Sequence, residues 1–264
     1  MPAKSLITLL TDFGTTDAFV ASMKGVILKI NPRATIIDIT HEIPPHGIRH
    51  AAFVLNSAYR YFPKDTIHVV VVDPGVGGSR KPLLIVHPRA FFIGPDNGVF
   101  SYVYKEKAKL KVYRLDTPRY QLKKYSPTFD GRDLFAPVAA WLSKRTAPVK
   151  LGQQVKGYVA FPIPEPRQLK DHSLQGQVIH TDRFGNLITN ITSEELRPWL
   201  SFRKTAAIKI KGQAIKGLKQ FYSQASPREL CALINSDGHL EIFYNQANAQ
   251  SVLNTKNDEP VIIS

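Results

Sequence analysis

The sequence predicts an α/β protein with two domains: an N-terminal α/β domain built on a mostly parallel sheet, and a C-terminal antiparallel β-barrel domain. In the first part of the chain, short apolar runs alternate with helical stretches, a pattern typical of a parallel sheet covered by helices. In the last part, short strands follow one another without crossover helices, which favours an antiparallel sheet or barrel. A proline-rich segment separates the two patterns.

The N-terminal elements follow from the spacing of apolar residues. Short apolar runs predict strands at 6–10, 35–39, 67–72, 83–87 and 91–93. Apolar residues at three- and four-residue spacing predict helices at 18–30, 48–61 and 133–144. Pro137 fits the third helix if it lies in the first turn, where its missing amide hydrogen costs nothing.

The connector between the two patterns is the segment 161–167. Its three prolines, Pro162, Pro164 and Pro166, indicate an extended and stiff chain. We therefore predict an N-terminal domain at 1–165 and a C-terminal domain at 173–264. Strands of the second domain are expected at 174–180, 206–210, 230–234, 239–244 and 260–263.

Composition bounds the class of protein. The chain has 264 residues, and a hydrophobic content of 43% supports a large core. No apolar run approaches the length of a membrane span and the N-terminus lacks a signal-peptide pattern, so we expect a cytoplasmic protein. The single cysteine, Cys231, excludes an intramolecular disulfide, and its apolar neighbours predict a buried, unreactive thiol.

The net charge of +14 raises the question of nucleic-acid binding. Four lysines alternate with other residues at 105–111, as on a solvated face, and other basic stretches fall between apolar segments at 119–124, 144–150 and 204–219. No RNA-binding signature, zinc-finger spacing or basic heptad accompanies them. We expect a generally basic surface, with neither nucleic acid nor membrane as a partner.

Two acidic turns mark the predicted site. Asp12 and Asp17 follow the strand at 6–10, and Asp73 directly follows the strand at 67–72. Open α/β sheets bind ligands at the carboxyl ends of their strands, so these turns are expected to form an active site at one edge of the sheet. Helix caps and turn acids are the alternative for either turn alone.

Five segments, taken in order, match one family. They are 11–17 (TDFGTTD), 73–77 (DPGVG), 94–98 (GPDNG), 128–133 (TFDGRD) and 182–191 (DRFGNLITNI). With them the chain resembles the S-adenosylmethionine hydrolases, or SAM hydroxide adenosyltransferases, which are related to fluorinase and chlorinase. The resemblance extends from about Leu9 to about Asn248. It implies an N-terminal α/β domain, a C-terminal β-barrel, a homotrimer, and small-molecule sites between neighbouring subunits.

The resemblance assigns substrate-binding roles to several polar residues. It places Asp12 on both ribose hydroxyls, a bidentate contact that suits a carboxylate. Asp17 and Asp182 would hold the methionine ammonium, and Ser236 would lie near the methionine carboxylate. Asn186 would contact the adenine edge, because an amide offers both a donor and an acceptor. A simple turn position is the alternative for Asn186.

The resemblance also implies apolar and aromatic walls around the substrate. Phe184 and Tyr222 would supply them, although a core position is the alternative for Phe184. Asn97 and Glu241 complete the set of substrate-binding candidates.

The reaction implied by the resemblance is in-line attack of water or hydroxide at C5′ of S-adenosyl-L-methionine, which yields adenosine and L-methionine. Asp73 and Arg80 match the Asp and Arg that hold this water in the family, whereas the third family residue, a His, is Asp130 here. A carboxylate is usually ionised and only accepts, while an imidazole can also donate near neutral pH. The alternative is therefore an adenosine- or S-adenosylmethionine-binding protein with lost or weak catalysis.

Four other kinds of site are not expected. The halogenating relatives carry a tyrosine where this chain has Asp73, and a carboxylate would repel a desolvated halide. No metal is expected, because the eight histidines lack ligand spacing. No cofactor is expected either, since S-adenosyl-L-methionine would be the substrate. A nucleic-acid-binding module is the least favoured hypothesis.

Overall fold

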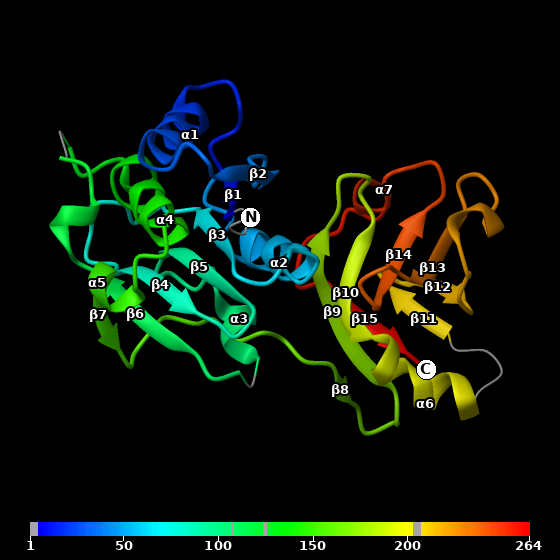
Figure 1. Cartoon of the computed structure of the whole chain (residues 1–264). Helices are drawn as coiled ribbons and strands as arrows, with labels where there is room; N and C mark the ends of the chain where they lie inside the picture. Colours follow the sequence, from blue (N-terminus) through cyan, green and yellow to red (C-terminus); the bar gives the residue numbers. More distant parts are fainter. Residues whose placement is uncertain (1–4, 107, 124–125, 203–206) are drawn as a thin grey trace. The chain divides into compact units, whose positions relative to one another are not determined.

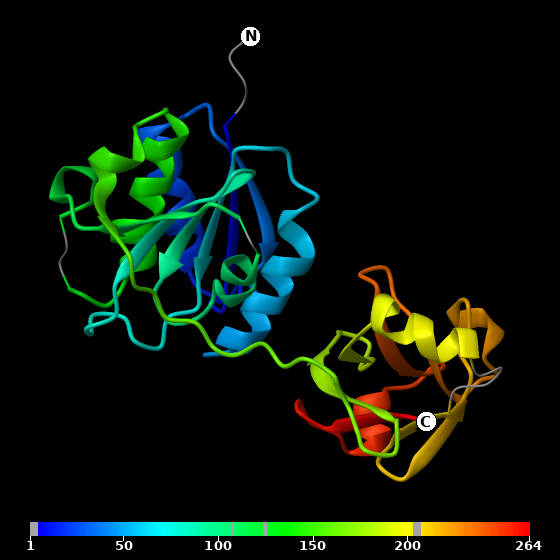
Figure 2. The same cartoon turned by 90° about the horizontal axis from the view of Figure 1, so that it is seen from below.

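The computed structural model describes residues 5–106, 108–123, 126–202 and 207–264 (Figures 1 and 2). The chain divides into two compact units, Met1–Pro162 and Ile163–Ser264. The division falls inside the proline-rich segment 161–167. One expected strand begins at residue 206, which lies outside the described residues. The same holds for residues 107, 124 and 204 of the basic stretches.

The N-terminal unit is built on a seven-stranded sheet with the order β2-β1-β3-β5-β4-β6-β7. The strands are β1 (Leu6–Thr11), β2 (Thr35–Thr40), β3 (Thr66–Val71), β4 (Pro82–Val86), β5 (Ala90–Pro95), β6 (Lys111–Leu115) and β7 (Gly152–Val155). Strands β2, β1, β3 and β5 pair in parallel, whereas β4, β6 and β7 are joined by antiparallel pairings.

This sheet is mixed but mostly parallel, as the sequence predicts. Strand β4 is antiparallel to β5, and β6 is antiparallel to β4, so β6 runs in the same direction as the four parallel strands. Five of the seven strands therefore share one direction. The two strands that sequence reasoning missed, β6 and β7, extend the sheet at the antiparallel edge.

Helices cover both faces of this sheet (Figure 1). They are α1 (Phe19–Ile30), α2 (Ile48–Tyr59), α3 (Ser101–Lys105), a π-helical turn (Gly131–Phe135), α4 (Ala136–Ser143) and α5 (Pro148–Leu151), with a 3-10 turn at Pro118–Tyr120. Helices α1 and α4 pack on the face that carries Leu9 and Val69, and α2 and α3 on the face that carries Leu10 and Val70. Successive strand residues face opposite sides, so the central strands are apolar throughout. Pro137 lies in the first turn of α4, as expected.

The C-terminal unit is an antiparallel, nearly closed barrel with the order β12-β11-β15-β9-β10-β14-β13 and with β8 paired to β9. Its strands are β8 (Arg167–Gln168), β9 (Leu174–Thr181), β10 (Leu187–Thr192), β11 (Ala207–Ile210), β12 (Gln213–Lys216), β13 (Leu230–Ile234), β14 (His239–Tyr244) and β15 (Pro260–Ile263). Beyond β12, the Lys219 amide donates to the Ala232 carbonyl at 2.8 Å, which brings the two ends of the sheet together. The predicted barrel is therefore confirmed.

The remaining elements of the barrel unit are α6 (Ser193–Phe202), α7 (Ala249–Leu253) and a 3-10 turn at Tyr222–Gln224. Cys231 lies in β13 with its side chain buried, and burial raises the pKa of its thiol to about 11. This is the unreactive thiol that the sequence predicts. Among the described residues, no helix combines the length and apolar character needed to cross a membrane.

Candidate functional site

The acidic turns of the N-terminal unit lie at one edge of its sheet. Strands β1 and β3 are parallel neighbours, and their last residues, Thr11 and Val71, are paired in the register. Asp12 follows Thr11 directly, and Asp73 lies two residues beyond Val71. Both carboxylates therefore leave the sheet at its carboxyl edge, where open α/β sheets place their ligands.

Asp73, Arg80 and Asp130 form a single buried charged cluster, which we call the N-terminal cluster. Arg80 donates from Nε to Asp73 Oδ1 and Oδ2 at 3.1 and 3.0 Å, and from Nη2 to Asp73 Oδ2 at 2.5 Å. The same Nη2 donates to Asp130 Oδ2 at 2.5 Å. The Arg80 side chain is 11% exposed and both carboxylates are 5% exposed. One guanidinium thus joins two acids that are far apart in the sequence.

The electrostatics of this cluster keep Arg80 charged. Burial on its own would lower the pKa of Arg80, but hydrogen bonds to Asp73 and Asp130 outweigh burial and raise that pKa. Two carboxylates and one guanidinium carry a net charge of −1 when all three are ionised. Carboxylate lone pairs that Arg80 does not use can accept hydrogen bonds from a water molecule.

The turn that carries Asp73 requires glycine. Gly77 has a φ of +76°, a conformation that residues with a Cβ rarely adopt. A Cβ on Gly77 would also lie 2.7 Å from the Pro127 carbonyl oxygen, in the segment that leads to Asp130. The backbone at Gly77 can therefore approach the backbone at Pro127 closely. This approach helps to bring Asp73 and Asp130 to the same guanidinium.

The other predicted residues of the N-terminal unit differ in exposure. Asp12 is half-buried, and its Oδ2 accepts from the His46 amide at 2.9 Å. Asp17 is exposed to solvent. Asn97 donates from Nδ2 to the Val72 carbonyl at 2.8 Å and accepts from the amide of Val99 at 3.2 Å. Its amide thus ties the end of β3 to the turn after β5, and a contact with substrate stays a prediction.

A pocket of about 540 Å³ in the C-terminal unit gathers four of the predicted residues, and we call it the barrel pocket. It is lined by Asp182, Phe184, Asn186, Tyr222, Phe243, Tyr244, Asn245, Gln246 and Ala247. Phe184 is 75% exposed and Tyr222 is 46% exposed, so both present aromatic surface outward. An acid, an amide and exposed rings in one pocket match the chemistry of a nucleoside carrying an ammonium group.

The backbone of the 182–186 turn is held by Asp182. Its Oδ1 accepts from the amides of Phe184 and Asn186 at 2.9 and 2.8 Å, and its Oδ2 accepts from Asn186 Nδ2 at 3.2 Å. Gly185 has a φ of +84°, and a Cβ there would lie 2.1 Å from the Asn248 side chain. The turn therefore depends on both the acid and the glycine.

Glu241 lies behind the pocket wall. It accepts from the Tyr222 hydroxyl at 2.7 Å and from Asn235 Nδ2 at 3.2 Å, and it is 3% exposed. Burial raises the pKa of Glu241, and the nearby charge of Asp182 raises it further against the opposing hydrogen bonds. Glu241 supports the pocket wall through Tyr222 but does not line the pocket.

The pocket includes residues that the sequence did not single out, and Ser236 lies outside it. Residues 243–247 line the pocket because β14 ends there. The strand predicted at 239–244 indicates where β14 ends but not that these residues line a pocket. Ser236 lies in the exposed turn after β13 and is not among the lining residues, so its contact with the methionine carboxylate stays a prediction.

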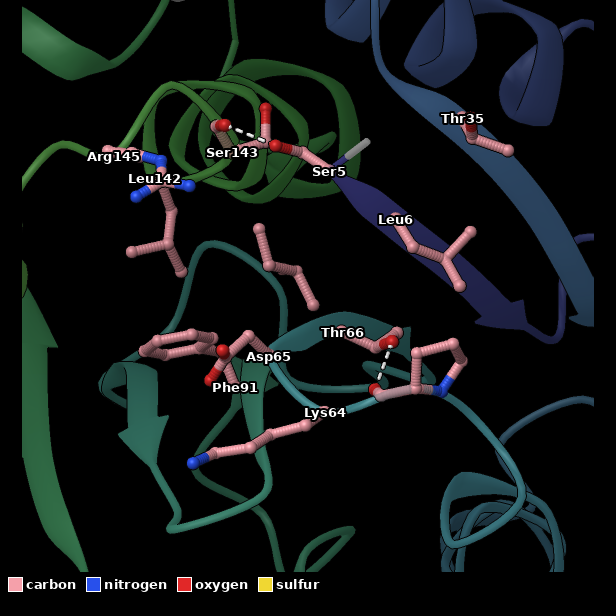
Figure 3. Close-up of a pocket in the computed structure, with 12 residues that line it drawn as sticks. Ser5, Leu6, Thr35, Lys64, Asp65, Thr66, Phe91, Leu142, Ser143 and Arg145 are labelled. Atoms are coloured by element: carbon pink, nitrogen blue, oxygen red, sulfur yellow. Dashed lines mark hydrogen bonds between the residues drawn. The ribbon is translucent and has the colours of Figure 1, made fainter. Parts of the chain in front are cut away.

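A second pocket in the N-terminal unit lies at the opposite, amino edge of the sheet (Figure 3). Its volume is about 490 Å³, and its walls include Leu6 and Ile67 near the starts of β1 and β3. Lys64 and Arg145 lie on different sides of it in Figure 3. None of the predicted site residues line it. Among the described residues, no group of three His, Cys, Asp or Glu side chains is arranged to hold a metal ion.

The fold and these two groups of residues define an α/β-plus-barrel protein with a charged cluster suited to holding water. Residues 7–152 match the model of the SAM hydroxide adenosyltransferase N-terminal domain, and residues 176–262 match that of the SAM hydroxide adenosyltransferase C-terminal domain. The chain belongs to the SAM hydroxide adenosyltransferase family, as the five segments predict.

Similar proteins and a similar solved structure support this assignment. An "(R)-S-adenosyl-L-methionine hydrolase" from Methanocaldococcus jannaschii is 38% identical over 261 residues, which cover 94% of this chain and 92% of that protein. A "Fluorinase" from Nocardia brasiliensis is 28% identical, with 73% of each chain covered. The crystal structure of an uncharacterized conserved protein from Thermotoga maritima has a TM-score of 0.89 and 34% identity, covering 97% of this chain and 99% of that one.

Proposed function

We propose that this protein hydrolyses S-adenosyl-L-methionine to adenosine and L-methionine. The observation that carries the proposal is the Arg80 guanidinium held between the carboxylates of Asp73 and Asp130 at the carboxyl edge of the sheet. Membership of the SAM hydroxide adenosyltransferase family and the hydrolase names of its relatives support the same reaction.

The proposed chemistry is a single displacement. A water oxygen held by the N-terminal cluster attacks C5′, and the C5′–S bond breaks with its electron pair remaining on sulfur. The sulfonium becomes the neutral thioether of methionine, and the proton of the water passes to a carboxylate of the cluster and then to solvent. Positioning supplies much of the acceleration, because the sulfonium is a good leaving group.

The net negative charge of the cluster favours water over a halide as the nucleophile. A halide would have to approach two carboxylates balanced by only one guanidinium, whereas water can donate to them. In the family pattern a His stands at position 130. We propose that Asp130 performs the accepting part of that role, and that Arg80 offsets the added negative charge.

Substrate-binding roles are proposed for residues of both units. Asp12 holds the ribose hydroxyls, and Asp17 and Asp182 pair with the methionine ammonium. The amide of Asn186 contacts adenine, and Tyr222 packs against the ligand. The remaining candidates, Asn97, Phe184, Ser236 and Glu241, complete or support these contacts.

We further propose a homotrimer in which ligand sites lie between neighbouring subunits, as the family resemblance implies. Light scattering during size-exclusion chromatography tests it: a mass of three times 29.6 kDa is expected, and a monomer would contradict it. The free, buried Cys231 supports a further proposal, that the protein acts in a reducing, cytoplasmic compartment.

The deciding experiment is incubation with the separated R and S sulfonium epimers of S-adenosyl-L-methionine, followed by chromatography for adenosine and methionine. Several relatives are named as hydrolases of the R epimer, so we expect the R epimer to be consumed faster. Equal yields of adenosine and methionine are required by the reaction. Measurable binding without either product would instead support the nucleoside-binding alternative.

A further inference from the structure

The loop that carries Asp12 is fastened to the segment His41–His46, which follows β2. Three contacts involve the backbone: the Gly14 amide donates to the His41 carbonyl at 2.8 Å, the Ile43 amide to the Thr11 carbonyl at 3.4 Å, and the His46 amide to Asp12 Oδ2 at 2.9 Å. The last of these acts directly on the carboxylate. The orientation of Asp12 therefore depends on where the 41–46 segment lies.

One buried side chain ties the same two segments together. His41, 5% exposed, has its Nδ1 2.8 Å from the Thr11 hydroxyl, and Thr11 is fully buried. The Thr11 oxygen also accepts from the Phe13 amide at 3.2 Å. If the hydroxyl donates to Nδ1, the oxygen is free to accept from Phe13, so both contacts are satisfied together. The hydroxyl thus connects the imidazole to the backbone on the far side of Asp12.

The other ring nitrogen of His41 faces a charged pair. Nε2 lies 3.1 Å from Asp38 Oδ1, and Asp38 Oδ2 accepts from Lys24 at 2.5 Å. Burial alone would raise the pKa of Asp38, but its contacts with Lys24 and His41 lower it, so this acid stays ionised. Asp38, on β2, and its partner Lys24, on α1, therefore place an ion pair on the Nε2 side of the ring.

We propose that His41 is a positioning residue for Asp12: the contact between its Nδ1 and the Thr11 hydroxyl holds the Asp12 loop in the geometry that binds the ribose diol. This inference rests on the ribose role proposed for Asp12. His41 touches neither Asp73 nor Arg80 in the described contacts, so it acts on binding rather than on the attacking water.

Two isosteric variants separate the two ring nitrogens. In His41→Asn the amide occupies the place of Nδ1 and keeps the contact with Thr11, whereas in His41→Gln the amide reaches the place of Nε2 and loses it. Isothermal titration with adenosine should show about tenfold weaker binding for His41→Gln and a change of less than about threefold for His41→Asn. Thr11→Val, which removes the hydroxyl and with it the acceptor for the Phe13 amide, should weaken adenosine binding at least as much as His41→Gln.

The structure offers a matched control in the same strand. Thr8 Oγ1 lies 2.7 Å from His68 Nδ1, and both residues are fully buried, but neither adjoins the Asp12 loop. The variants His68→Asn and His68→Gln should lower the melting temperature about as much as the corresponding His41 variants do. Their adenosine affinity should nevertheless stay within about twofold of the wild-type value. In kinetics, His41→Gln should raise KM about tenfold with kcat changed by less than about threefold.

The outcomes distinguish this inference from the proposed function. Unchanged adenosine affinity in His41→Gln would overturn the inference. It would also be overturned if His41→Asn and His41→Gln lost equal adenosine affinity, in proportion to their loss of stability. An Asp12→Ala variant measured alongside shows whether Asp12 binds the ribose at all. If Asp12→Ala binds adenosine normally, the ribose role itself fails, and the inference fails with it.

Discussion

Arg80 and Asp130 stand fifty positions apart in the chain, yet Nη2 of Arg80 lies 2.5 Å from Oδ2 of Asp130. The same nitrogen also donates to Asp73. Asp130, where the resemblance predicts a histidine, is therefore hydrogen-bonded to the same guanidinium that holds Asp73. Any effect of a change at position 130 must include its effect on Arg80.

Replacing Arg80 should abolish turnover. In Arg80→Ala the two buried carboxylates lose their shared cation, and the water loses its fixed place, so we expect kcat to fall by about a hundredfold or more. Removing one partner of a buried ion pair also costs about 3–5 kcal/mol of stability, so folding is checked by circular dichroism. Adenosine affinity should remain within about threefold. A variant that keeps most of its rate would show that other groups hold the water.

Changing Asp130 to histidine should raise the rate at neutral pH, by about tenfold. An imidazole can both accept a proton from the water and donate, whereas the native carboxylate mainly accepts. Initial rates of adenosine formation measure the effect. A slower Asp130→His enzyme would mean that the second carboxylate is needed to pair with Arg80.

Asp12 and Asp182 should affect different ligands. Asp12→Ala should weaken adenosine and S-adenosylmethionine together, about tenfold or more, because both carry the ribose diol. Asp182→Asn keeps an oxygen to accept from the amides of the 182–186 turn, but it loses the charge and the oxygen that accepts from Asn186 Nδ2. It should therefore weaken S-adenosylmethionine much more than adenosine. Isothermal titration of both variants with both ligands tests these predictions. If Asp182→Asn lost equal affinity for adenosine and S-adenosylmethionine, the ammonium role of Asp182 would be contradicted.

Glu241 should make stability depend on pH. Burial raises its pKa in the folded protein above the ordinary value of 4.5, so the folded state binds this proton more tightly than the unfolded state. Its stabilisation is complete below about pH 4.5 and is lost as the pH rises through the raised pKa. The side chain in Glu241→Gln stays neutral at every pH. The melting temperature of this variant relative to that of the wild type should therefore increase as the pH rises over that range.

Gly185 should tolerate no side chain. An alanine there combines a φ of +84° with a Cβ 2.1 Å from Asn248, so we expect a loss of at least about 2 kcal/mol. Gly212, with a φ of +72° and open space around it, is the matched control and should lose only about 1 kcal/mol as alanine. Urea denaturation measures both. Equal losses would show that the Asn248 contact relaxes without cost.

The sequence by itself determined the fold class and the family of this protein. Alternating apolar runs and helical stretches predicted the parallel core of the first unit, because strands buried on both faces must be apolar throughout. The placement of Asp12 and Asp73 directly after two such strands predicted that both acids leave the same edge of the sheet. The five ordered segments predicted the family, since they lie in continuous stretches that need no knowledge of long-range contacts.

Only the tertiary structure decided how the side chains are partnered. That Arg80 bridges Asp73 and Asp130, that Glu241 lies behind Tyr222, and that the amide of Asn97 is used by the backbone all depend on contacts between distant segments. The direction of a side chain at a strand end or turn is set by register and packing, and local spacing does not specify either. For the same reason no pattern in the sequence pointed to His41, whose imidazole meets Thr11 only because β1 and β2 are neighbours in the sheet.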